Sequence, residues 1–260
     1  MRTAEELWQA VRRAGPMVHA VSNVVTANDC ANLLLAVGAR PIMAQAPAEA
    51  AEITAACQAT VLNLGTPNDE KFEACRMAGQ EANRLGHPLV LDPVGVGASA
   101  YRRRETQALL GAVHPQIVRA NAGEVRALLQ ADTQNWGVDS PLHIREQERA
   151  QARELARRLG CVVLLTGEVD LVTDGDRAES VSGGTPRARQ ITGMGCMLSV
   201  LCGALAAVAE PFEAAVAAAR SWKVCAERAE ARSGGAGLGS LHTALFDEAS
   251  LLGQAAHGNA

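Results

Sequence analysis

Short apolar stretches alternate along this chain with longer stretches in which apolar residues recur every three or four positions. The short stretches carry Val, Ile, Leu and Ala on consecutive positions, which is typical of strands buried on both faces of a parallel sheet. This pattern predicts strands at Met17–Val21, Pro41–Ala44, Thr60–Leu64, Pro88–Asp92, Gln116–Arg119, Cys161–Thr166 and Asp170–Thr173.

The longer stretches predict helices, and several of them stop at a glycine, namely Gly15, Gly38, Gly86 and Gly160. A left-handed residue, most often glycine, commonly ends a helix. Strands that alternate with helices predict one domain, residues 1–260, with an α/β fold of three layers in which helices flank a mostly parallel central sheet. The predicted helices are Ala4–Arg13, Val24–Val37, Pro47–Cys57, Asp69–Leu85, Arg102–Ala112, Gly123–Gln130, His143–Leu159, Cys196–Ala209, Pro211–Ala231 and Leu241–Leu252.

Composition narrows the class of protein. Hydrophobic residues make up 48% of the chain and charged residues 20%, as in ordinary globular proteins. The formal charge is −4 and the longest basic run is Arg102–Arg104, so nucleic acid is not the expected partner. The longest apolar run, Met197–Ala209, is too short to cross a bilayer, so we expect no membrane partner.

The seven cysteines are scattered, odd in number and without a C-x-x-C pair. They indicate free thiols in a reducing compartment rather than a disulfide framework or a zinc site. The N-terminal MRTAEELWQAVRRAG is typical of an amphipathic helix and lacks the features of a signal peptide. Together these features predict a cytoplasmic protein.

Polar residues follow the predicted strands at the points where the strands end. Asp92 ends one strand, Arg119 another and Thr166 a third, and Asn23 follows the first. Ligands of open α/β sheets bind beyond the carboxyl ends of the strands, so these side chains are expected to meet there. Asp92 and Glu124 are candidates to hold Mg²⁺, mainly through water. The structural alternative is an Asp that caps a turn and a Glu that stabilises a helix N-terminus.

The segment QITGMGCMLSVLCGALAA, residues 190–207, contains the second candidate feature. Thr192, Gly193 and Gly195 lead directly into Cys196 and a long apolar helix. Glycines allow successive backbone N–H groups to converge on an anion, and the helix N-terminus adds positive potential. The segment therefore predicts either a phosphate-binding loop with Cys196 beside it or a glycine-containing loop that only caps a core helix.

Two common nucleotide motifs do not apply here. Gly95-Val-Gly97-Ala-Ser-Ala100 matches G-x-G-x-x-A, but Asp92-Pro93 separates it from its strand and it lies in the middle of the chain, so no nicotinamide cofactor is expected. No G-x-x-x-x-G-K-[ST] motif occurs, which excludes a P-loop NTPase. If ATP is used, its phosphates are expected at the loop Thr192–Cys196.

The motif series of the chain resembles that of the hydroxyethylthiazole kinases, members of the ribokinase-like superfamily. The resemblance runs from about Pro16 to Leu201 and includes, in order, HAVSNVVTANDCANLLLAVGARPIMAQAPAEAAEI, VLNLGTP, PLVLDPVGVGAS, VRANAGEV, GVDS, VVLLTGEVDLVTDG and ITGMGCMLS. It implies a ribokinase-like fold, phosphorylation of the primary alcohol of 4-methyl-5-(2-hydroxyethyl)thiazole by MgATP in thiamine salvage, and a homotrimer with active sites at the subunit interfaces.

The same resemblance implies roles for individual residues. Met43, Asn23 and Gly193 would contact the thiazole alcohol, and Cys196 would take the place of the Asp base of most ribokinase-like enzymes. Arg119 and Thr166 would bind ATP, and Asp92 and Glu124 would organise Mg²⁺. One departure is Met194, which stands where the family usually has Thr; it removes a hydroxyl group that could have touched a phosphate.

Other functions stay open at the level of sequence. A related kinase of a pyrimidine alcohol or a sugar would keep the ATP half of the site. A Cys-nucleophile hydrolase or amidotransferase would use Cys196 with His19 or His87 as base, although His19, inside an apolar strand, is more typical of a structural histidine. A non-catalytic protein that binds the thiazole or a nucleotide is the third alternative.

Overall fold

One eight-stranded sheet organises the molecule. The structure, a computed structural model, describes residues 2–129 and 141–252; the side chains of 141–145 are not described. The strands lie in the order β2-β1-β3-β4-β5-β6-β7-β8; β2 through β6 are parallel, and β7 and β8 are antiparallel to their neighbours. Their bounds are β1 Met17–Val21, β2 Arg40–Ile42, β3 Ala59–Asn63, β4 Leu89–Asp92, β5 Ile117–Asn121, β6 Val162–Thr166, β7 Asp170–Thr173 and β8 Ala178–Val181.

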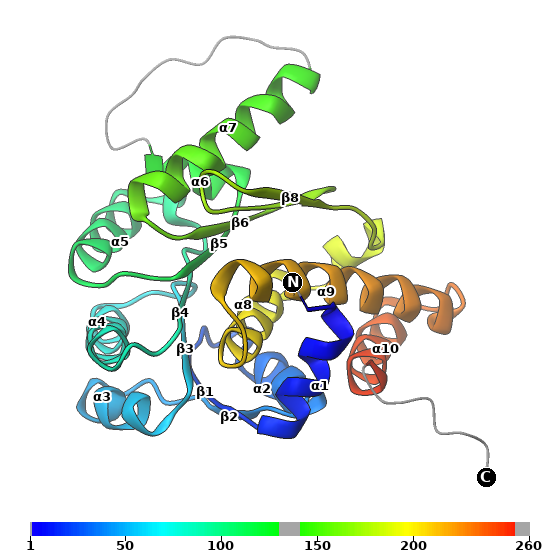
Figure 1. The fold of residues 1–260 in the computed structure, drawn as a ribbon, viewed down its shortest axis with the longest axis horizontal. Coiled ribbons are helices and arrows are strands. Elements are labelled where there is room, and N and C mark those ends of the chain that lie inside the picture. Colours follow the sequence, from blue (N-terminus) through cyan, green and yellow to red (C-terminus); the bar gives the residue numbers. More distant parts are fainter. Residues whose placement is uncertain (1, 130–140, 253–260) are drawn as a thin grey trace.

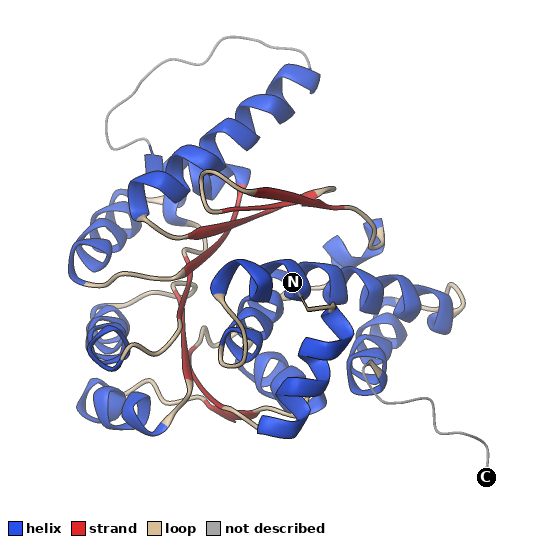
Figure 2. Ribbon diagram, viewed as in Figure 1, coloured by secondary structure: helices blue, strands red, loops and turns tan. Residues whose placement is uncertain are grey.

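Helices cover both faces of this sheet, as the three-layer prediction requires (Figures 1 and 2). One face packs against α1 Ala4–Ala14, α2 Ala27–Ala36, α8 Met194–Ala206, α9 Pro211–Ser233 and α10 Leu238–Leu251. The other packs against α3 Pro47–Ala56, α4 Asp69–Leu85, α5 Ala100–Ala112, α6 Ala122–Leu129 and α7 Pro141–Leu159. Two short 3₁₀ helices, η1 Val96–Ala98 and η2 Pro186–Gln190, lie in connecting loops.

The two faces have separate hydrophobic cores because consecutive strand residues point to opposite sides. In β4, Val90 belongs to the core under α8, whereas Leu89 and Leu91 belong to the core under α4 and α5. Strands that are buried on both sides explain the unbroken apolar stretches in the sequence. Among the described residues, no helix combines the length and the hydropathy needed to cross a membrane.

The predicted elements are confirmed in order, several of them with bounds that differ by one to three residues, and one strand is added. β8 was not predicted; its AESV sequence leaves most of its side chains on the surface, so it lacks the apolar signal of the other strands. α2 begins at Ala27 rather than Val24, because the chain turns after Asn23 and leaves Val24 and Val25 exposed. α8 begins at Met194, two residues before the predicted Cys196. Gln130 and the GVDS segment, 137–140, lie outside the described residues.

All four helix-ending glycines of the sequence prediction have positive φ, as expected for that position. Gly193 also has a positive φ, +85°, and occupies the N-cap of α8. A Cβ atom there would lie 2.7 Å from Cγ2 of Thr26. Only glycine therefore fits both the backbone conformation and the space at this turn.

Candidate functional site

Three strand ends on the carboxyl edge of the sheet are joined by side-chain hydrogen bonds. Asn63, the last residue of β3, donates from Nδ2 to Oδ2 of Asp92 at 2.9 Å. Its Oδ1 accepts from Nδ2 of Asn23, which follows β1, at 3.0 Å and from the Gly65 amide at 3.0 Å. The parallel register of β1, β3 and β4 brings these ends side by side. Asn63 thus links the first candidate residue, Asn23, to the buried carboxyl group of Asp92.

Asp92 is fully buried and has one oxygen free of hydrogen bonds. Oδ2 accepts from Asn63 and, at 2.8 Å, from Ser199 Oγ on α8, whereas Oδ1 lies 3.5 Å from Nη1 of Arg119. Burial raises the pKa of the carboxyl group, and the positive charge of Arg119 is the largest influence in the opposite direction. The result is a buried acid with one acceptor directed at a cation.

Arg119 connects Asp92 to the other side of the site. It extends from β5 and donates from Nη2 to Oγ1 of Thr166, at the end of β6, at 2.7 Å. Its guanidinium lies directly against Gly195 of α8, because a Cβ atom added to Gly195 would overlap Nη1, Nη2 and Cζ of Arg119. The absence of a side chain at Gly195 is what allows the cation to reach the first turn of the helix.

The first turn of α8 lies at the centre of these residues. The first backbone N–H groups of a helix have no partner inside the helix and carry its positive dipole end. Here they belong to Met194, Gly195 and Cys196, since Met197 is the first whose N–H bonds back to Gly193 O, at 2.8 Å. Because α8 begins at Met194 and not at the predicted Cys196, Cys196 is the third helical residue and not the first. The N-terminal amides and a guanidinium together form a positive site suited to an anion.

Cys196 lies on the side of this turn that faces Asn23. Its half-buried Sγ accepts a hydrogen bond from Asn23 Nδ2 at 3.4 Å. Burial raises the pKa of the Cys196 thiol and the charge of Asp92 adds to the rise, whereas hydrogen bonds to Thr26 and Asn63 lower it. A helix N-terminus by itself favours the thiolate form of a cysteine. Here burial and the charge of Asp92 act in the opposite direction, and the pKa of Cys196 is raised.

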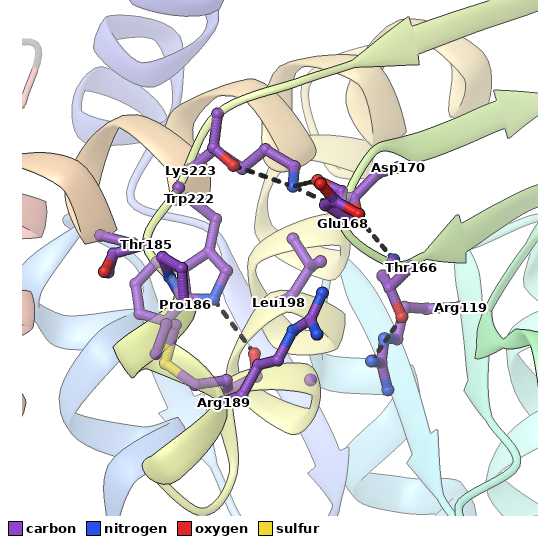
Figure 3. Close-up of a pocket in the computed structure, with 17 residues that line it drawn as sticks. Arg119, Thr166, Glu168, Asp170, Thr185, Pro186, Arg189, Leu198, Trp222 and Lys223 are labelled. Carbon is purple, nitrogen blue, oxygen red and sulfur yellow. Dashed lines mark hydrogen bonds and ion pairs between the residues drawn. The ribbon is translucent and has the colours of Figure 1, made fainter.

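A cavity of about 340 Å³ opens on the other side of the same turn (Figure 3). Arg119, Thr166, Met194 and Gly195 line its inner end, and Trp222 of α9 lies opposite, held by a hydrogen bond of 3.1 Å from its ring nitrogen to Met194 O. Most of the remaining wall comes from two loops, one after β6 and one after β8, together with Leu198 of α8 and with Lys223 and Ala226 of α9. The start of α8 therefore separates this cavity from Cys196 and Asn23.

The remaining predicted residues lie around this centre. Glu124 forms a capping box with Asn121 at the start of α6: Oε2 accepts from the Asn121 amide at 2.9 Å, and Asn121 Oδ1 accepts from the Glu124 amide at 2.9 Å. Oε1 of Glu124 accepts from the Gly95 amide at 2.9 Å. Met43 follows β2 and packs half-buried against the core beneath α8. The structural role foreseen for Glu124 is thus observed, and its role toward Mg²⁺ stays a prediction.

The two histidines required by the hydrolase alternative are not poised as bases for Cys196. His19 is buried with Nδ1 on Thr54 Oγ1 at 2.8 Å and Nε2 on Ala44 O at 3.1 Å, and burial lowers its pKa. His87 precedes β4, so it lies at the amino edge of the sheet, opposite the edge that carries Asp92. The geometry favours the phosphate-binding alternative for residues 190–207.

Sequence reasoning missed Asn63, Ser199 and the pair Asp170–Lys223. Asn63 ends a strand just as Asp92 does, so the argument that ligands bind beyond the carboxyl ends of the strands could have identified it. Ser199 lies one helical turn after Gly195, inside an apolar run that gives no sign of its contact with Asp92. Asp170, at the start of β7, accepts from the Gly167 amide at 2.9 Å and lies 3.5 Å from Lys223 Nζ.

Solved structures with little sequence similarity share the fold of this chain. A ribokinase-like superfamily protein from Enterococcus faecalis superposes with a TM-score of 0.69 at 10% identity over 96% of this chain and 95% of its own. At this identity the likeness concerns the fold alone. The central sheet of this chain, covered by helices on both faces, thus has the fold of that protein.

Closer relatives narrow the class to one family. Residues 8–254 match the model of the hydroxyethylthiazole kinase family. Hydroxyethylthiazole kinase of Exiguobacterium sp. is 42% identical over 91% of this chain and 90% of its own length, and that of Methanoculleus marisnigri is 44% identical over 93% and 86%. The structure of the hydroxyethylthiazole kinase protein from Pyrococcus horikoshii superposes with a TM-score of 0.86 at 35% identity, covering 95% of this chain and 92% of that one. The chain belongs to the hydroxyethylthiazole kinase family.

Proposed function

We propose that this protein transfers the γ-phosphoryl group of ATP to the hydroxyl group of 4-methyl-5-(2-hydroxyethyl)thiazole, a step of thiamine salvage. The observation that carries the proposal is the first turn of α8, which has Arg119 and a cavity on one side and Cys196 with Asn23 on the other. Phosphoryl transfer needs chiefly alignment and charge neutralisation. A positive helix start between two binding spaces supplies both.

In this proposal the nucleotide occupies the cavity, and its phosphates point toward Arg119 and the amides of Met194, Gly195 and Cys196. Thr166 orients Arg119 through their hydrogen bond of 2.7 Å. The amides are fixed before the reaction, so they stabilise the moving phosphoryl group without reorganisation. Met194 contributes its backbone to this site and its side chain to the cavity wall. Loss of the usual Thr hydroxyl therefore leaves the amides in place.

Mg²⁺ fits this site as an ion carried mainly by the nucleotide. The described residues contain no group of three or more His, Cys, Asp or Glu side chains able to hold a metal. Oδ1 of Asp92 is buried and accepts no hydrogen bond, which suits a water molecule of the ion's hydration shell. Glu124 already accepts hydrogen bonds from two backbone amides, so it would act on the ion through water. The bound ion would neutralise charge on the phosphates.

The thiazole alcohol is proposed to lie on the opposite side, among Asn23, Met43, Gly193 and Cys196. Asn23 Oδ1 accepts from the Val25 and Thr26 amides, so its Nδ2 is fixed toward Asn63 and Cys196. Cys196 with a raised pKa is a weak base, so its main task would be to position the alcohol and to take its proton late in the transfer.

An assay of ADP release with the thiazole alcohol, ATP and Mg²⁺ tests the proposal. We expect phosphorylated thiazole alcohol by mass spectrometry, and an Arg119→Ala variant with a KM for ATP raised about tenfold because a charged phosphate contact is lost. A pyrimidine alcohol, a sugar and a thioester serve as competing substrates. Faster phosphorylation of the pyrimidine alcohol or sugar, or turnover of the thioester without ATP, would overturn the substrate assignment; nucleotide binding without turnover would indicate the non-catalytic alternative.

Substitution of Cys196 by alanine tests its role separately. We expect kcat to fall about tenfold, less than the roughly 10²–10⁴-fold effect of a full general base, because the raised pKa keeps the thiol protonated at neutral pH. The KM for ATP should stay within about twofold, since the cavity does not include Cys196. An unchanged kcat would remove Cys196 from the mechanism and leave the kinase assignment intact.

We also propose a homotrimer whose interface lies beside the thiazole site. Val24 and Val25 are 75% and 63% exposed directly after Asn23, and Leu35 on α2 is 59% exposed. Exposed apolar side chains beside a binding site, as Val24 and Val25 are here, are typical of an interface. Light scattering should give three times the chain mass, and Val25→Asp should reduce both the mass and the activity. A fully active monomer would contradict this assembly. The seven free thiols support a reducing location such as the cytoplasm.

A further inference from the structure

The loop between β8 and α8 forms one wall of the cavity. Gly183, Gly184, Thr185, Pro186 and Arg189 all line it. Loops with two adjacent glycines are ordinarily mobile, and Gly183 and Gly184 both have positive φ. A wall of this kind binds a ligand well only if other contacts hold it in place.

Three polar side chains of α9 hold this loop in sequence order. Lys223, Glu227 and Glu230 are spaced four and three residues apart, so they lie on one face of the helix. Lys223 Nζ donates to Gly183 O at 3.3 Å, and Glu227 Oε1 accepts from the Gly184 amide at 2.8 Å. Glu230 accepts from Thr185 Oγ1 at 3.3 Å and from Arg187 Nη1 at 2.8 Å. We call these three residues the α9 row.

The α9 row also ties this wall to the opposite one. Lys223 Nζ donates to Glu168 O at 3.1 Å and lies 3.5 Å from Oδ1 of Asp170 (Figure 3). Glu168 lies in the turn between β6 and β7, and Asp170 begins β7; both line the cavity beside Thr166. One ammonium group thus bridges the two loops that bound the cavity, and its charge is balanced by a buried carboxyl group.

The held loop ends in Arg189, whose side chain lines the cavity. Arg187, two residues earlier in η2, is bound to Glu230 and to Ala236 O, away from the cavity. Successive residues of a 3₁₀ helix point about 120° apart, so Arg189 is directed elsewhere. Figure 3 shows its guanidinium reaching toward the space between Leu198 and Arg119. Within the described part of the chain it has no hydrogen bond or ion pair.

We propose that the α9 row is a positioning device that fixes the loop after β8 as a preformed wall of the nucleotide cavity and holds Arg189 ready to bind the nucleotide phosphates opposite Arg119. The inference rests on the proposed function, because it needs ATP in this cavity. Lys223, Glu227 and Glu230 of the α9 row act through the loop and touch no reacting atom. Arg189 alone would contact the ligand. A loop ordered in advance loses less conformational entropy on binding, so affinity for the nucleotide depends on the α9 row.

Calorimetric titration with a non-hydrolysable ATP analogue and Mg²⁺ tests this inference. Glu227→Ala frees the Gly184 amide and should weaken binding about five- to tenfold, which is within the net contribution of one ordinary hydrogen bond. Arg189→Ala should weaken it about tenfold. In steady-state assays both should raise the KM for ATP and leave kcat within about twofold. Glu227→Gln keeps an acceptor for the amide and should restore most of the affinity.

The double variant Glu227→Ala, Arg189→Ala decides whether the α9 row acts through Arg189. If the α9 row acts through Arg189, the double variant should bind the ATP analogue as well as the single variant with the lower affinity. If the two residues act independently, the fold-losses in affinity of the two single variants should multiply in the double variant. Arg220→Ala is the matched control, because Arg220 lies on the same helix and pairs with Glu179, away from the cavity. Unchanged affinity in Glu227→Ala, or multiplied effects in the double variant, would overturn the inference. A wild-type protein that binds no nucleotide would overturn the proposed function as well.

Discussion

Asp92→Asn is expected to lower kcat about 10²-fold while the protein stays folded. Asp92 holds Asn63 and Ser199 through Oδ2 and faces Arg119 through Oδ1, so the variant loses the charge that positions the guanidinium and any ion beside it. Displacement of reacting groups by about 1 Å commonly costs this much in rate. The measurement is single-turnover phosphorylation of the thiazole alcohol, with circular dichroism to establish folding.

Asp174→Asn provides the control for this prediction. Asp174 also accepts hydrogen bonds from an arginine, Arg177, and forms an ion pair with it. This pair lies at an exposed turn between β7 and β8. An exposed pair of this kind contributes little, so activity should not change. A rate for Asp92→Asn within about threefold of the control would show that the buried carboxyl group has no part in phosphoryl transfer.

Gly195→Ala is expected to reduce both nucleotide affinity and stability. The new methyl group would occupy the position of the Arg119 guanidinium, and the arginine would have to leave Asp92 and Thr166. Overpacking of this kind costs roughly 1–3 kcal/mol in free energy of unfolding. Displacement of the cation should weaken nucleotide binding at least about tenfold.

Gly111→Ala is the matched control, since it is also a glycine inside a helix, α5, but a Cβ atom there meets nothing within 4 Å. Alanine is favoured over glycine in a helix by about 0.5–1 kcal/mol, so this variant should melt at a slightly higher temperature. The two substitutions are chemically identical and should shift the melting temperature in opposite directions. A Gly195→Ala protein with wild-type affinity would contradict the close contact between Arg119 and the start of α8.

Much of the fold could be read from the sequence because both faces of the sheet are covered. Each of β1, β3, β4, β5 and β6 has at least two apolar residues on consecutive positions, a pattern that strands with one face in solvent rarely show. β8 escaped prediction for the opposite reason: it is the edge strand, and Ala178 and Ser180 are turned to solvent. A run of apolar residues indicates a buried strand, and most of β8 is not buried.

The site was predictable to the extent that topology alone forms it. Parallel strands bring their carboxyl ends to one edge, so Asn23, Asp92, Arg119 and Thr166 could be grouped before any side chain was placed. The pKa of Cys196 could not be predicted, because it depends on burial and on its distance to Asp92, which come from packing. The α9 row could not be found either. Its glutamates and lysine look like an ordinary solvent-facing helix until the loop that they hold is known.

The order of elements along the chain has a consequence for synthesis on the ribosome. Every strand of the sheet precedes Met194, whereas α8, α9 and α10, which cover most of one face, follow it. If the strands pair as soon as β8 has been synthesised, one face of the sheet then has a wide apolar surface exposed to water. Such surfaces invite aggregation until they are covered. The segment that covers this face begins with the first turn of α8, so the same part of the chain closes the core and supplies the turn proposed to bind the phosphates.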